Sequence, residues 1–222
     1  MTTVIGIVSS KGGTGKSSIC NLFAITLANK PIDKRVLVID ATENKSLSYL
    51  NVYKEQSFYK IVQNSIDNVP KILAAESDNY DLIFVDFPNN SSLIGYNTAS
   101  LCCNHFIIPT GVGIMDQIAT KESLSELSEI KKLRKAAGFN TSIKVLPSRV
   151  NNKEAVQDLY VLLNKQNIEH FEFPLSTDED LAYLIEQNQP IMDYVTEGID
   201  WTSGQVVFHN VFIEFHKQLE SE

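Results

Sequence analysis

The residues best suited to chemistry lie together near the amino terminus, where the chain reads Ser10-Lys11-Gly12-Gly13-Thr14-Gly15-Lys16-Ser17-Ser18. Glycines let a backbone curl so that successive N–H groups point at an anion, and the N-terminus of a following helix adds partial positive charge. Lys16 is placed to reach β- and γ-phosphates, and the hydroxyl of Ser17 is placed to ligate Mg²⁺. We therefore predict that this segment binds the phosphates of a nucleotide.

Two aspartates follow buried-type apolar runs further along the chain. Asp40 ends the run Val36–Ile39, and Asp86 ends the run Leu82–Val85. Both acids are predicted to lie at the carboxyl ends of strands, where an open α/β sheet places its ligands. Asp86 resembles the Walker B aspartate, which holds Mg²⁺ directly or through water. Either aspartate alone could be a strand-end cap, but together with the glycine loop they favour a metal-nucleotide site.

These residues need a sheet to position them, and the rest of the sequence supplies one. Strands are expected at 4–8, 35–40, 81–86, 105–109, 142–146 and more weakly at 170–173. Helices are expected at 19–28, at 118–137 with Gly138 as its stop, and around 155–163, 181–185 and 206–219. Strands alternating with helices predict an α/β fold, a mostly parallel twisted sheet with helices on both faces. We find no linker or internal repeat and expect residues 1–222 to form one domain.

Composition narrows the class of protein. A chain of 222 residues with 43% hydrophobic residues and a formal net charge of −8 fits a globular domain and not a protein whose whole surface coats nucleic acid. Its cysteines, Cys20, Cys102 and Cys103, have no zinc-site spacing. The apolar run 4–8 is too short for a signal peptide or membrane span. We therefore expect a cytoplasmic protein.

One departure in the glycine loop is informative. The usual pattern has glycine where this chain has Ser10, and the form Lys-Gly-Gly-x-Gly-Lys-Ser resembles the deviant Walker A loop of the ParA/MinD superfamily of ATPases. The resemblance implies a P-loop NTPase fold, ATP and Mg²⁺ as cofactors, and an ATP-dependent homodimer in which Lys11 reaches the partner's phosphates. It implies catalytic roles for Lys11, Lys16 and Asp40 and Mg²⁺ binding by Ser17 and Asp86. It implies nucleotide contacts from Lys11, Gly12, Gly13, Thr14, Gly15, Lys16, Ser17 and Ser18.

The resemblance breaks after the second expected strand. Asp40 is similar to the first acid of the family's Asp-x-Asp-Pro motif, but Thr42 stands where the second acid would be. In relatives that second aspartate is associated with positioning the attacking water, and a threonine hydroxyl is not a carboxylate base. Two outcomes stay open: slow hydrolysis supported by Asp40 or Glu43, or a site that binds ATP and barely cleaves it.

Weaker similarities extend the resemblance from residue 4 to about residue 194. They comprise His105–Thr110, Phe173–Leu175 and Gln189–Tyr194. Relatives often place an adenine-contacting asparagine after the fifth strand, where this chain has Pro147-Ser148-Arg149, so the choice of base stays open with ATP favoured over GTP. No helix-turn-helix precedes the first strand, as in the short ParA type.

The leading hypothesis is a ParA-like ATPase that partitions or positions plasmid DNA, chromosomal DNA or another cargo, with an activating partner of the centromere-binding type. Nonspecific DNA contact, and with it association with the nucleoid, would use the basic residues Lys131, Lys132, Arg134 and Lys135, which otherwise complement a helix dipole. One alternative is a MinD-like membrane-associated ATPase, which the acidic residues of the closing helix at 206–219 disfavour. A P-loop biosynthetic ligase is the other.

Overall fold

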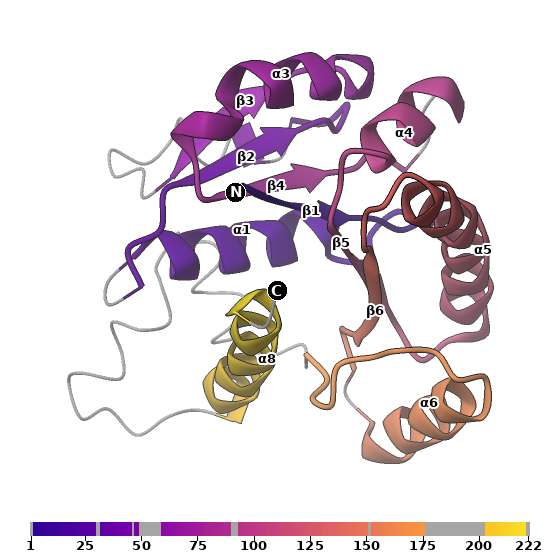
Figure 1. Cartoon of the computed structure of the whole chain (residues 1–222). Helices are drawn as coiled ribbons and strands as arrows, with labels where there is room; N and C mark the ends of the chain where they lie inside the picture. The colour runs from indigo at the N-terminus through magenta and orange to yellow at the C-terminus, as the bar shows by residue number, and fades with distance from the viewer. Residues whose placement is uncertain are drawn as a thin grey trace.

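The computed structural model describes residues 2–29, 32–45, 47–48, 59–89, 93–150, 152–175 and 203–220. Within these ranges six parallel strands form one sheet in the order β3-β2-β4-β1-β5-β6 (Figure 1). The strands are β1 (Thr3–Ile7), β2 (Val36–Asp40), β3 (Lys60–Gln63), β4 (Leu82–Asp86), β5 (His105–Thr110) and β6 (Ser142–Pro147). The predicted α/β fold is confirmed.

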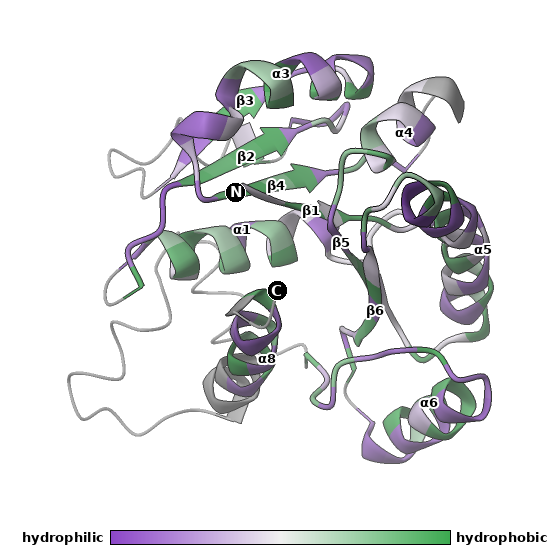
Figure 2. Cartoon of the chain, viewed as in Figure 1, coloured by the Kyte–Doolittle hydropathy of each residue, from purple (hydrophilic) through white to green (hydrophobic). Residues whose placement is uncertain are grey.

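Helices cover both faces of the sheet because its strands are apolar on both sides (Figure 2). One face carries α1 (Lys16–Ala28) and α8 (Ser203–Glu220). The other carries α3 (Val69–Glu76), α4 (Leu93–Ser100), α5 (Ile114–Ala136) and α6 (Lys153–Lys165). Alternate residues of β1 supply the two cores, with Ile5 and Ile7 on the α1 side and Val4 on the opposite side.

Some predicted elements differ from the structure. The edge strand β3 and the short helices α3 and α4 were not predicted, because β3 has exposed ends and these helices are only eight residues long. The strand expected at 170–173 was wrong, since only a single parallel bridge joins His170 to Val145. Pro174, which cannot donate to a sheet ladder, follows that segment closely. The helix expected around 181–185 and the segment Gln189–Tyr194 lie outside the described residues.

The long helix and the closing helix agree with their patterns. Gly138 has φ of 85° just after α5, the left-handed conformation of a helix stop. In α8, Val211, Phe212 and Phe215 are buried, and the Phe215 ring centroid lies 4.7 Å from that of Phe23 in α1. The apolar face of α8 therefore packs on the core. Among the described residues, no helix combines the length and the apolar character needed to cross a membrane.

Candidate nucleotide site

The phosphate loop connects β1 to α1 at the carboxyl edge of the sheet. Gly13 and Gly15 have φ values of 73° and 90°, which glycine adopts without strain. Gly15 is the N-cap of α1, and the first turn of that helix has no side-chain cap and no acidic residue. The first N–H groups of α1 therefore remain available to an anion.

A cavity of about 360 Å³ lies at this loop. It lies between the loop and the segments that follow β2 and β4. The positions of Asp40 and Asp86 at the ends of these strands predicted this arrangement. Its lining residues are Gly13, Thr14, Gly15, Lys16, Ser17, Ser18, Thr42, Glu43, Asn44, Phe87, Pro88 and Asn89. The cavity thus contains most of the predicted phosphate contacts, but neither Lys11 nor Gly12 lines it.

Lys16 is the buried cation of the cavity. Its residue is 7% exposed, and burial lowers the pKa of its amine, an effect that the charge of Asp86 opposes. The amine donates to the side-chain oxygen of Asn89. An ammonium held at the floor of an anion loop is suited to the β- and γ-phosphates of a nucleotide.

Ser17 and Asp86 form the predicted metal-binding pair. The Ser17 hydroxyl donates to Asp86 Oδ2 at 2.5 Å, while Asp86 Oδ1 is buried and has no hydrogen-bond partner among the described residues. Burial raises the pKa of Asp86 to about 7; nearby Asp40 also raises it, whereas the Ser17 bond and Lys16 lower it. An orphaned carboxylate oxygen beside a hydroxyl fits Mg²⁺, which takes one or two protein oxygens together with phosphate and water.

The metal would be shared with the nucleotide. No group of three or more His, Cys, Asp or Glu side chains in the described ranges could hold a metal ion by itself. A site with one carboxylate and one hydroxyl is the kind that Mg²⁺ occupies when phosphates complete its shell. When bound, the metal would neutralise phosphate charge next to Lys16.

Asp40 lies beside this pair but its carboxylate is already occupied. Its Oδ1 accepts from the backbone N–H and the hydroxyl of Thr42, at 3.1 and 2.6 Å. Its Oδ2 accepts from the backbone N–H and the hydroxyl of Ser48, both at 3.1 Å. The side chain is fully buried. In this arrangement Asp40 organises the loop after β2, and its predicted catalytic role stays a prediction.

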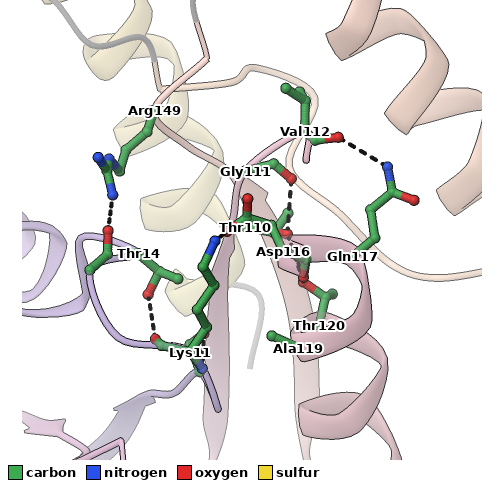
Figure 3. Close-up of polar contacts among 12 residues, drawn as sticks. Lys11, Thr14, Thr110, Gly111, Val112, Asp116, Gln117, Ala119, Thr120 and Arg149 are labelled. Carbon is green, nitrogen blue, oxygen red and sulfur yellow. Dashed lines mark hydrogen bonds and ion pairs between the residues drawn. The ribbon is translucent and has the colours of Figure 1, made fainter. Parts of the chain in front are cut away.

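Lys11 turns away from the cavity toward α5. Its amine lies 2.6 Å from Asp116 Oδ1 in the first turn of that helix (Figure 3). The two side chains are 41% and 20% exposed. The two lysines of the loop therefore differ in position, since Lys16 lines the cavity of its own chain and Lys11 does not.

Ser10, where the usual loop has glycine, docks the loop on α5. Its backbone N–H donates to the buried Ser123 hydroxyl at 3.1 Å. Its own hydroxyl contacts the carbonyl of Ala119 and the carboxylate of Glu122, both at 3.1 Å. The departure from glycine thus has a structural reason, because a side chain here ties the first half of the loop to the helix.

Three residues near the loop were not predicted to take part in the site. Asn89, three residues after Asp86, contacts Lys16. Asp116 pairs with Lys11. Arg149, which follows β6 with φ of 58°, donates to the carbonyl of Gly13 (Figure 3). The only sequence signal for Arg149 was its position beside that of the family's adenine-contacting asparagine, and for Asn89 and Asp116 the signal was their place just after a strand end.

The comparison with family models agrees with this geometry. Residues 5–191 match the CobQ/CobB/MinD/ParA nucleotide binding domain. The chain belongs to this family. No curated protein sequence matches it significantly. Because the family is one of nucleotide binding domains, the cavity over the glycine loop is the candidate nucleotide site of this chain.

Solved structures of the family share the fold at low sequence identity. A Cyanothece McdA variant in complex with ATP is 15% identical, with a TM-score of 0.71 and coverage of 99% of this chain and 96% of that chain. A plasmid partition protein from Borrelia burgdorferi bound to AMPPNP is 17% identical, with a TM-score of 0.71 and coverage of 98% and 100%. The MinD cell division protein of Aquifex aeolicus is 16% identical, with a TM-score of 0.72 and coverage of 97% and 98%.

Fewer basic side chains reach the surface at the end of α5 than the sequence predicted. Arg134 is 6% exposed and donates to the Thr141 hydroxyl at 2.7 Å, so it is part of the core and does not face a partner. Lys131 pairs with Glu169 at 3.7 Å. Lys132 pairs with Glu129 at 2.6 Å. Lys135 is exposed as well, so three lysines remain at the surface for a nucleic acid.

Proposed function

We propose that this chain is a ParA-like ATPase whose ATP- and Mg²⁺-bound form pairs with a second copy and resets by slow hydrolysis. The observation that carries the proposal is the division between the two lysines of the phosphate loop. Lys16 is buried in the cavity beside Ser17 and Asp86, whereas Lys11 is half-exposed at the rim and contacts α5. A second cation that leaves its own cavity is suited to the phosphates of another subunit.

The cargo of this switch would be plasmid or chromosomal DNA or another cellular assembly. The McdA and plasmid partition folds of similar size support this class. Contact with DNA would come from the three surface lysines of α5 and would weaken with salt. We propose a cytoplasmic, nucleoid-associated protein that an activating partner of the centromere-binding type stimulates.

Membrane attachment through the closing helix is not favoured. Val211, Phe212 and Phe215 turn the apolar face of α8 into the core against α1. An amphipathic anchor needs that face free for lipid and cationic residues beside it. The packing of α8 therefore supports the partition-type proposal over a MinD-like membrane role.

Size-exclusion chromatography with light scattering tests the proposal. Wild type should dimerise in ATP with Mg²⁺ and stay monomeric in ADP. Lys16→Ala should lose ATP binding, whereas Lys11→Ala should bind ATP and fail to dimerise. Lys153→Ala, an exposed lysine on α6, is the matched control and should behave as wild type.

The same samples give the DNA measurement. ATP-bound wild type should bind duplex DNA with an affinity that falls as salt rises. A wild-type protein that remains monomeric in saturating ATP and Mg²⁺ would contradict the proposal. Phosphate release that depends on a small carboxylic acid would instead indicate a biosynthetic ligase.

A further inference from the structure

The ion pair between Lys11 and Asp116 lies in a site shaped to hold it. Asp116 is in the first turn of α5, where the positive end of the helix dipole stabilises a carboxylate. A Cβ at Gly111 would lie 2.9 Å from Asp116 Oδ2, and one at Gly113 would lie 3.0 Å from the same oxygen. These two glycines therefore leave the space that the carboxylate occupies.

The backbone around Asp116 is fixed as well. The hydroxyl of Thr120 donates to the Asp116 carbonyl at 2.8 Å and lies 2.6 Å from the Thr110 hydroxyl, which ties the first turn of α5 to the end of β5 (Figure 3). Ser10 docks the phosphate loop on the same helix. Lys11 and Asp116 are thus presented to each other by two anchored segments.

Apolar side chains flank this ion pair at the surface. Ile114 is 76% exposed and Met115 is 66% exposed, immediately before Asp116, and Ile118 follows at 45%. Exposed apolar groups beside an anion-binding loop are suited to burial by another protein surface. The ion pair therefore lies at the rim of the face that a second copy would cover in the proposed dimer.

We propose that Asp116 is a positioning residue that retains Lys11 within its own subunit until ATP-driven pairing with a second copy draws the amine to the partner's phosphates. The inference rests on the proposed function and adds its regulation. A triphosphate carries several negative charges and a carboxylate carries one, so the exchange favours the dimer only when ATP is present. Without a nucleotide, pairing would break the ion pair with no phosphate to replace it, and ADP lacks the γ-phosphate and so offers Lys11 less negative charge than ATP.

Replacing Asp116 by asparagine tests this directly, because asparagine fits the same space and removes the charge. Asp116→Asn should bind ATP like wild type and dimerise in ATP and Mg²⁺ at a protein concentration lower by about threefold to fivefold, the range expected for a half-exposed ion pair. It should also form more dimer in ADP. Thermal melting verifies that the variant is folded.

Two further variants make the result specific to the ion pair. Glu122→Gln removes another carboxylate of α5 that contacts the loop through Ser10 and not through Lys11, and it should leave the dimerisation midpoint unchanged. Lys11→Ala combined with Asp116→Asn should dimerise no better than Lys11→Ala alone, because the gain acts through Lys11.

The outcomes separate this inference from the proposed function. If wild type dimerises in ATP and Asp116→Asn dimerises equally or less well, the retention role of Asp116 is overturned and the switch stands. If neither protein dimerises, both proposals fail. If only Asp116→Asn dimerises, ATP does not release Lys11 in the wild-type protein, and both the proposed switch and its regulation by Asp116 are overturned.

Discussion

Asp40 and Asp86 are register partners at the ends of the neighbouring strands β2 and β4, and both are fully buried. Their surroundings are nevertheless opposite. Within the described part of the chain, Asp40 accepts four hydrogen bonds from Thr42 and Ser48, whereas Asp86 accepts one from Ser17 and keeps an oxygen without a partner. The donors to Asp40 thus come from the segment after its own strand, whereas the single donor to Asp86 comes from α1.

The difference indicates that Asp40 stabilises the local structure, whereas Asp86 is available to a ligand. A carboxylate with all its acceptor positions filled contributes to stability, because its donors would otherwise be buried without partners. A buried carboxylate with an empty oxygen costs stability in the free protein and gains it back when a cation binds. We infer that the β4 end of the site serves Mg²⁺ and the β2 end serves the loop.

The largest expected effect comes from Asp86→Asn. The variant loses the carboxylate oxygen beside Ser17 that has no partner among the described residues, and this should weaken Mg²⁺-dependent ATP binding about 100-fold, at the upper end of what metal-site substitutions cost. Titrations with a fluorescent ATP analogue in Mg²⁺ and in EDTA measure it, with the exposed aspartate variant Asp158→Asn as control. An unchanged difference between Mg²⁺ and EDTA would show that the metal lies elsewhere.

Thr42→Asp tests what the β2 end lacks for hydrolysis. It introduces the carboxylate that the family motif has at this position, and general-base assistance is worth about 100-fold or more in favourable cases. We expect ATP turnover to rise about 10-fold, since repulsion from Asp40 opposes part of the gain. Phosphate release at saturating ATP measures it, and Thr42→Ser should leave the rate unchanged. Equal rates in all three proteins would mean that another group activates the water.

The smallest expected change is in the free energy of unfolding of Asp40→Asn. An amide can accept at one atom only, so two of the four donors would lose their acceptor, at a cost of about 2 kcal/mol. Urea unfolding in EDTA measures the difference from wild type. Asp86→Asn serves as the comparison and should be at least as stable as wild type. If Asp86→Asn were the less stable variant, the contrast between the two aspartates would be reversed.

The sequence predicted those parts of the site that depend on local order along the chain. The glycine loop, the start of α1 and the strand-end aspartates follow from strand, turn and helix patterns within a few residues. The strand β3 was missed because only four residues with exposed ends pair at the sheet edge.

The remaining contacts depend on the tertiary fold. Lys11 and Asp116 are 105 residues apart in the chain, and Ser10 and Ser123 are 113 apart, so no local pattern brings them together. Ser48 donates to Asp40 because the chain after β2 folds back to the end of that strand. The hydrophobic periodicity of the sequence does not predict this conformation. The spacing of the sequence predicted that Asp40 and Asp86 lie at strand ends. It could not predict which of the two carboxylates already accepts hydrogen bonds at both oxygens.

The central place of β1 also sets an order for biosynthesis. This strand, at residues Thr3–Ile7, pairs with β4 on one side and β5 on the other. This strand is synthesised before both of its neighbours, so it waits for β4 (Leu82–Asp86) and β5 (His105–Thr110) before either edge of its backbone is paired. Since α8 also packs on α1, the helix that follows the glycine loop acquires its full set of core contacts only after residues 203–220 have been synthesised.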